Sequence, residues 1–213
     1  MENLPLIKFA ELNKGIIIRD SFQDIFLIAD IDGHSELDDQ DVQDHTMPMR
    51  LDALLMVLVL EGSSEIALDY VPYTIGANSF TIIMPTHTIQ LNKVSKGFKG
   101  KLLVISREFL DECNTAKRSP SMANYMQLRK NPCTTFEAQE TELVDNYIEL
   151  LRSKIKNRTH FFQKEVMQNA FVGFLLEIAN IFMGKKDGLL MPALSRKEEL
   201  FEQFLQLLFE HCK

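Results

Sequence analysis

The sequence has few cysteines, and they lie far apart. Cys113, Cys133 and Cys212 are the three cysteines of the chain, and no two of them form a CxxC pair. Without such pairs, neither a disulfide framework nor a cysteine zinc site is expected. The cysteines therefore predict free thiols in a reducing compartment.

Long apolar runs and targeting signals are also lacking. The longest uninterrupted apolar run, residues 53–60, is far shorter than the roughly 20 residues needed to span a bilayer. The N-terminus has neither the cationic start nor the apolar segment of a signal peptide. These absences predict a cytoplasmic protein with no membrane partner.

An excess of basic residues and glycine-based catalytic motifs are missing as well. The formal net charge of -7 does not favour direct binding to nucleic acid. The nine glycines never fall into the patterns of a nucleophile elbow, a P-loop or a dinucleotide-binding fingerprint. The composition, with 46% hydrophobic and 25% charged residues, is that of an ordinary globular protein.

The most informative stretch that is present runs from Met49 to Pro85. It contains three apolar runs, residues 51–60, 65–75 and 79–84, separated by turn-forming residues at 62–64 and 76–78. Their lengths and flanking glycines favour strands, and their spacing favours an antiparallel sandwich or barrel. Residues 53–60 are apolar at odd-numbered and even-numbered positions alike, so both faces of this strand are expected to be covered. We therefore expect a central strand with a cavity on one face and helices on the other. An edge strand expected within residues 1–20 and further strands at 22–31, 88–94 and 98–106 bring the total to seven, close to the roughly eight strands that close a small barrel.

After Ser106 the spacing of apolar residues changes from the two-residue period of strands to the 3.6-residue period of helices. Ser106 is the expected N-cap of a short helix, and longer helices are expected over 119–131, 137–157 and 160–183. Residues 195–198 have the pattern of a capping box that starts a last helix. This last helix reaches Lys213 without a cap, so we expect that the natural chain continues.

The helix expected over 160–183 is apolar well beyond one face. That breadth predicts either a core helix enclosed within one chain or a helix that also contacts a partner subunit. Under the second hypothesis the expected dimer-interface residues are Val166, Ala170, Phe171, Phe174 and Ile178.

The stretch from Asp30 to Asp44 carries seven acidic residues and no cation. A divalent-cation loop is one hypothesis for it. The spacing does not match the EF-hand pattern, so a solvated acidic loop is favoured.

Five short motifs occur along the chain in a fixed order: Met49-Arg50-Leu51-Asp52, Leu60-Glu61-Gly62, Met84-Pro85, Phe98-Lys99-Gly100 and Ser106-Arg107-Glu108-Phe109-Leu110. In this order they resemble the N-terminal cupin-like domain of bacterial AraC-family transcription regulators. The stretch 195–205 resembles the helix that precedes the DNA-binding domain in such regulators. The resemblance implies an α+β fold, with an N-terminal cupin-like antiparallel β-barrel followed by C-terminal helices.

The same resemblance implies a division of the chain and a function. A sensor barrel would occupy residues 1–106, a helical dimerisation region 107–194, and a linker helix 195–213. The chain would be the small-molecule-sensing and dimerising part of a transcription factor. It would act as a homodimer without a cofactor, and it would reach DNA only through a helix-turn-helix domain that is missing from this chain. The expected ligand pocket has apolar walls at Leu55, Val57 and Met84 and polar groups at Arg50, Asp52 and His87.

Two other functions stay open. A metal-dependent cupin enzyme needs an HxH pair, but Met47 takes the place of the second histidine after His45. Asp52 and His87 are the remaining candidate ligands. Since a catalytic metal needs about three convergent ligands, we expect no metal and no enzymatic activity. The third hypothesis is a constitutive dimerisation module that binds no small molecule, which a solidly filled barrel would favour.

Overall fold

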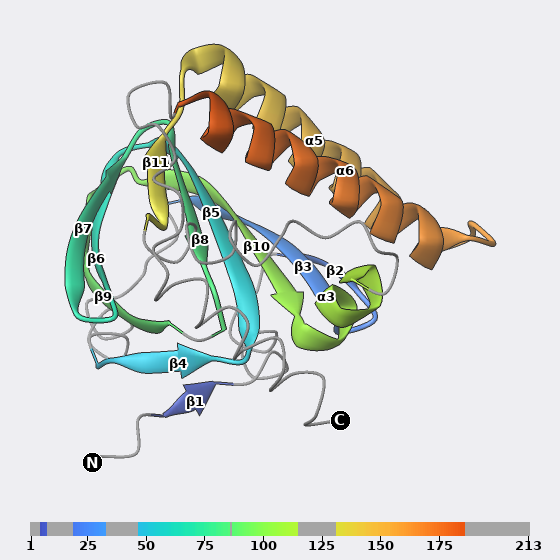
Figure 1. Ribbon diagram of the computed structural model, residues 1–213, viewed down its shortest axis with the longest axis horizontal. Coiled ribbons are helices and arrows are strands. Elements are labelled where there is room, and N and C mark those ends of the chain that lie inside the picture. The colour runs from blue at the N-terminus through green and yellow to red at the C-terminus, as the bar shows by residue number, and fades with distance from the viewer. Residues whose placement is uncertain (1–4, 8–18, 33–46, 86, 115–130, 186–213) are drawn as a thin grey trace, which may run out of the picture.

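Two β-sheets face each other, and helices cover the outer side of one of them (Figure 1). The computed structural model describes residues 5–7, 19–32, 47–85, 87–114 and 131–185. Sheet A has five strands in the order β1 (Leu6–Ile7), β4 (Met49–Leu51), β9 (Thr88–Val94), β6 (Ser63–Leu68) and β7 (Val71–Gly76). Sheet B has six strands in the order β11 (Cys133–Thr135), β8 (Ser79–Ile83), β5 (Ala53–Glu61), β10 (Lys99–Ser106), β3 (Phe26–Asp32) and β2 (Arg19–Phe22).

The sheets are antiparallel apart from the parallel pairing of β1 with β4. Among the described strands, no ladder of hydrogen bonds joins sheet A to sheet B. The prediction of a closed barrel was therefore wrong in this respect, because closure requires an unbroken ladder around the shell. The broader prediction, an α+β fold of antiparallel sheet followed by helices, is confirmed.

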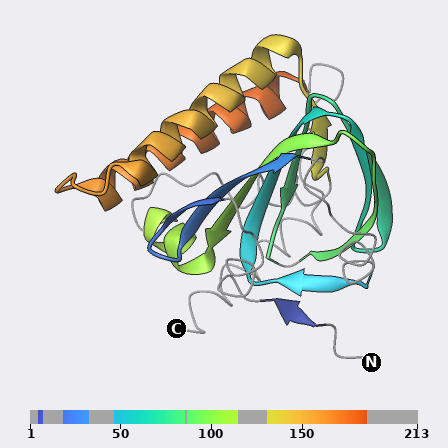
Figure 2. The ribbon, with the colours of Figure 1, turned by 180° about the vertical axis from the view of Figure 1, so that it is seen from behind.

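Three helices are described: α3 (Arg107–Asn114), α5 (Ala138–Lys156) and α6 (Gln163–Gly184). The hydroxyl of Ser106 accepts a hydrogen bond from the amide of Phe109 at 3.2 Å, which confirms its expected role as the N-cap of α3. Helices α5 and α6 run side by side across the outer face of sheet B (Figures 1 and 2). The helix expected at 119–131, the last helix and most of the acidic stretch lie largely or wholly outside the described residues.

Strand β5 is central in sheet B, as its unbroken apolar sequence predicted. Leu54, Met56 and Leu58 belong to the hydrophobic cluster on the helix side, whereas Ala53 and Val59 belong to the cluster between the sheets. Alternate side chains of a strand point to opposite faces, so a strand buried on both faces must be apolar throughout.

Two hairpin turns were missed in the sequence, because they contain no glycine. The run 65–75 is two strands, β6 and β7, joined at Asp69 and Tyr70 with φ angles of 49° and 66°. The expected strand at 22–31 is likewise divided, with Gln23 and Asp24 at 48° and 53° between β2 and β3. Two consecutive left-handed residues are the signature of a type I′ hairpin turn.

Aromatic side chains join the helices to sheet B. Phe26 from β3, Phe109 from α3 and Phe171 from α6 form a triangle, with ring centroids 5.4 to 5.7 Å apart. A second contact places Phe174 of α6 6.3 Å from Phe80 of β8. All five rings are fully buried. Sheet and helices therefore share one core, and β11 adds a strand to the sheet from beyond the expected boundary at residue 106. None of the helices in the described ranges is both long and apolar enough to cross a membrane.

Candidate ligand-binding site

The inner face of sheet B carries one row of side chains that crosses all six strands. The register of the strands aligns Thr81 with Val57, Val57 with Leu102, and Leu102 with Ala29. The row ends at Cys133 on β11 and at Arg19 on β2. Because aligned residues of adjacent strands point to the same face, these side chains form one continuous strip between the sheets.

The middle of this inner row is apolar and only half-buried. Val57 and Leu102 are of intermediate exposure although they lie in the centre of their strands. Opposite them, sheet A contributes Tyr73, Ile89 and Leu91, which are also partly exposed. An apolar wall that the described residues leave partly uncovered is the kind of surface that small-molecule sites use.

Polar groups stand at the ends of the inner row. The hydroxyl of Thr81 donates to the sulfur of Cys133 at 3.6 Å, and Thr81 itself is fully buried. Burial raises the pKa of the Cys133 thiol, and the Thr81 hydrogen bond opposes this only in part. Burial also raises the pKa of Tyr73, with a further contribution from Cys133 and Asp69. The thiol and the phenol are therefore neutral hydrogen-bonding groups near pH 7, and this thiol is not an activated nucleophile.

The six pocket residues expected from the sequence do not come together. Leu55 and Val57 lie on the inner face of β5, as expected of a pocket wall. Met84 lies on the opposite side, in the cluster beneath the helices. Arg50 is exposed on the short strand β4. Asp52 accepts a hydrogen bond from Nε of Arg107 at 3.1 Å and forms an ion pair with its Nη2 at 3.0 Å, at the start of α3 and outside the row.

His87 is buried but is used to hold two turns together. Its Nδ1 accepts a hydrogen bond from the amide of Met84 at 3.1 Å, and its Nε2 lies 4.0 Å from a carboxylate oxygen of Asp69. The other carboxylate oxygen of Asp69 accepts from the amide of Thr88 at 2.8 Å. This histidine thus connects the β8–β9 loop to the β6–β7 turn, so its role is structural. Within the described ranges, no group of three or more histidine, cysteine or acidic side chains is placed to hold a metal ion.

The expected interface residues on α6 divide into two sets. Phe171, Phe174 and Ile178 are at most 2% exposed and pack against sheet B within the same chain. Val166 and Ala170 are partly exposed on the same helix. The three buried side chains are already used by the core, so dimerisation stays a prediction for which other surface residues must be considered.

The outer face of sheet B carries a cluster of ion pairs that the sequence did not reveal. Arg152 of α5 is 9% exposed and contacts Asp20 of β2 at 2.9 Å and Asp30 of β3 at 2.6 Å. Lys101 of β10 contacts Asp145 at 2.5 Å and Glu149 at 2.7 Å, both on α5. These contacts, which we call the α5 clamp, bind one helix to three adjacent strands.

Strand alternation places the clamp directly behind the candidate site. Asp30 precedes Ile31, and Lys101 precedes Leu102. In each pair the first residue bonds to α5, while the second belongs to the cluster between the sheets. A shift of either strand therefore moves both the inner wall and the anchor of α5.

Comparison with known proteins gives structural similarity only. No protein-family model matches the sequence, and no curated protein matches it. Among solved structures, ToxT K231A from Vibrio cholerae strain SCE256 is 17% identical, with a TM-score of 0.44 over 73% of this chain and 56% of ToxT. The AraC-like transcriptional activator CuxR is 11% identical, with a TM-score of 0.35 over 76% of this chain and 57% of CuxR.

Cupin proteins are also among the matched structures. A cupin protein from Bacteroides fragilis, BF4112, is 14% identical, with a TM-score of 0.25 over 38% of this chain and 64% of that protein. The matched structures thus include both AraC-like regulators and cupins. This chain spans little more than half the length of the two regulators.

Proposed function

We propose that this chain is the small-molecule-sensing part of an AraC-type transcription regulator, and that it performs no chemistry itself. The observation that carries the proposal is the inner row of sheet B. It is apolar and half-buried at Val57 and Leu102, and it has polar residues only at its ends. Such a surface gains free energy when an apolar ligand covers it, by about 25 cal/mol for each Å² removed from water.

The row also defines the class of ligand. An apolar body would lie over Val57 and Leu102. A polar group of the ligand could hydrogen-bond to Cys133 at one end of the row. An elongated amphipathic molecule, such as a fatty acid, matches this order of groups.

Ligand binding would act on the helices through the α5 clamp. A ligand between the sheets presses on Leu102 and Ile31, whose neighbours Lys101 and Asp30 hold α5. A ligand changes a conformational equilibrium only if it binds one arrangement better than the other. Here the two arrangements would differ in how α5 and α6 lie on sheet B.

Dimerisation through the helical pair belongs to the same proposal. Leu143 and Leu150 lie seven residues apart on α5, hence on one side of it, and are 38% and 40% exposed. Leu176 of α6 is 55% exposed and lies opposite the buried positions of that helix. These leucines replace the buried phenylalanines as the interface we would test. A helix-turn-helix domain following the present chain would make the DNA contact.

Ligand titration followed by thermal unfolding tests the sensing role. An unsaturated fatty acid is the first compound to use, since ToxT has been observed with one bound. We expect the ligand to raise the unfolding temperature of the native chain. The Leu102→Trp variant, which fills the inner row, should lose this response. The Val71→Trp variant, which alters a 51%-exposed site on β7, should keep it.

Two results would count against the sensing role. One is the absence of any ligand-induced shift across a panel of apolar acids, alcohols and sterols. The other is an equal response in the native chain and in Leu102→Trp. For the dimer, sedimentation equilibrium of Leu150→Glu and Leu176→Glu should show monomers where the native chain shows dimers.

A further inference from the structure

The turn between α5 and α6 exposes two adjacent aromatic rings. Phe161 is 99% exposed and Phe162 is 65% exposed. The turn lies at the end of the helical pair that extends past the sheets, on the right of Figure 1. Single exposed apolar residues are common on protein surfaces, but two neighbouring phenylalanines at a protruding end need an explanation.

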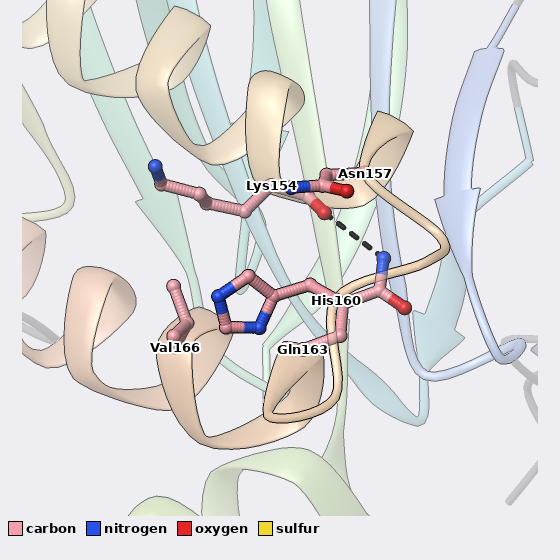
Figure 3. A pocket seen from close by; sticks show the side chains of 5 residues that line it. All are labelled: Lys154, Asn157, His160, Gln163 and Val166. Carbon is pink, nitrogen blue, oxygen red and sulfur yellow. Dashed lines mark hydrogen bonds between the residues drawn. The ribbon is translucent and has the colours of Figure 1, made fainter.

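This tip, residues 157–162, is a hydrogen-bonded structure that holds the rings outward. The amide of Phe162 donates to Nδ1 of His160 at 3.1 Å, and the amide of His160 donates to the carbonyl of Asn157 at 3.3 Å. The side chain of Gln163 donates to the carbonyls of Lys154 and Ile155 at 2.9 and 3.1 Å. Figure 3 shows Gln163 reaching back to Lys154 beneath the turn. A tip fixed in this way loses little conformational entropy on binding.

Positive charge predominates in the sequence around the tip, while Glu112 and Glu165 lie near Lys164. Between Lys154 and Lys164 the chain carries four cations, Lys154, Lys156, Arg158 and Lys164, and no acidic residue. Lys156 contacts Asp20 at 3.6 Å, and Lys164 contacts Glu112 at 2.6 Å. Within the described residues, Lys154 and Arg158 make no ion pair. This basic region stands out in a chain with a net charge of -7.

We propose that the tip docks on a lipid bilayer that carries anionic headgroups. The two exposed rings lie within the turn, and the cations flank them on the last turn of α5, in the connection and on the first turn of α6. A bilayer offers a partner to both kinds of group, since its hydrocarbon can take up the rings and its anionic phosphate groups can pair with the cations around the point of entry.

The docking is expected to be weak and reversible. Each cation near an anionic membrane contributes about a fivefold gain in partitioning, and each inserted ring about a tenfold gain. The inference does not depend on the sensing role proposed above, because the tip lies outside the inner row of sheet B.

Co-sedimentation with vesicles tests the proposal on the whole chain. Vesicles of an equal mixture of phosphatidylcholine and phosphatidylglycerol should pellet the protein, whereas pure phosphatidylcholine should pellet much less. The double variant Phe161→Ser with Phe162→Ser should bind about 100-fold more weakly. The double variant Lys154→Gln with Arg158→Gln should bind about 25-fold more weakly and lose most of its salt dependence. Both variants alter surface groups, and circular dichroism verifies their folding.

The matched control is Val71→Ser, which removes a 51%-exposed apolar side chain from β7, away from the tip and from the helices. It should bind vesicles like the native chain. The proposal is overturned if the native chain does not bind the anionic vesicles, or if the phenylalanine variant binds as well as the native chain. It is also overturned if the phenylalanine variant keeps its vesicle binding but loses self-association. In that case the tip contacts a second copy of the chain.

Discussion

Replacing Arg152 by methionine tests whether the α5 clamp holds the helices on the sheet. The guanidinium contacts Asp20 at 2.9 Å, Asp30 at 2.6 Å and Glu149 at 3.3 Å. Methionine keeps much of the volume and the apolar stem but removes the charge, the hydrogen bonds to Asp20 and Asp30, and the ion pair with Glu149. The variant therefore leaves three carboxylates close together without their shared cation.

The cost follows from how well water reaches those carboxylates. Removing one partner of a fully buried ion pair costs about 3–5 kcal/mol. Arg152 is nearly buried, but the side chains of Asp20, Asp30 and Glu149 are 23%, 51% and 48% exposed. Solvent screening lowers the penalty at the two more exposed groups. We therefore expect a loss of about 2–3 kcal/mol in the free energy of unfolding.

Urea denaturation measures this loss, and the control is Lys99→Met. Lys99 lies on β10, the strand that also carries Lys101, and pairs with Glu61 at 3.0 Å, with both side chains well exposed. An exposed pair contributes about 0.5 kcal/mol or less, so the control should unfold almost like the native chain. If Arg152→Met costs no more than Lys99→Met, the clamp does not anchor α5. The route proposed for ligand signalling would then be wrong as well.

The pH dependence of stability gives a second readout of the clamp. Burial by itself would raise the pKa of Glu149, but the hydrogen bond and charge of Lys101 and the charges of Arg152 and Lys156 lower it below 4.5. Its contribution is thus present above pH 4.5 and is lost as the pH falls through the lowered pKa. Burial would lower the pKa of Lys101, but its bonds to Asp145 and Glu149 raise it above 10.5. This contribution is present below pH 10.5 and is lost as the pH rises through the raised pKa.

Four further outcomes can be measured by the same unfolding assays. Glu149→Gln should flatten the acid limb of the stability curve, and an unchanged limb would show that this carboxylate is not stabilised by its partners. Gly100→Ala should cost about 2 kcal/mol, because a Cβ there would lie 2.7 Å from the carbonyl oxygen of Leu58. Gly173→Ala, with no atom within 4 Å of the added Cβ, should instead stabilise α6 by up to about 1 kcal/mol. Phe171→Ala should cost about 3–5 kcal/mol through the cavity it leaves among buried rings, and a loss below about 1 kcal/mol would contradict the packing described.

Local patterns in the sequence predicted several elements of this fold correctly. The apolar run of β5 identified a strand covered on both faces, and Ser106 marked the start of α3. The bounds expected for α5 and α6, 137–157 and 160–183, lie within three residues of the observed ones. These features depend on the spacing of apolar side chains and on helix capping, and both act over a few neighbouring residues.

The relative positions of the six expected pocket residues were predicted less well, because they depend on which face of the sheet each side chain takes. Leu55 and Val57 point to the inner face of β5, whereas Met84 continues the alternation of Ile82 and Ile83 and so lies on the helix side. Nothing local links Cys133 to Thr81, which is 52 residues away and becomes its neighbour through the pairing of β11 with β8.

The sequence by itself determined a mainly antiparallel sheet followed by amphipathic helices. The reason is that the spacing of apolar residues, the turn-forming residues and the helix caps are each encoded within a few neighbouring residues. Only the tertiary structure decided that the phenylalanines of α6 serve the core and that Arg152 joins a helix to two strands. The reason is physical. Burial and ion pairing depend on distances between segments far apart in the chain, and strand register and helix packing set those distances.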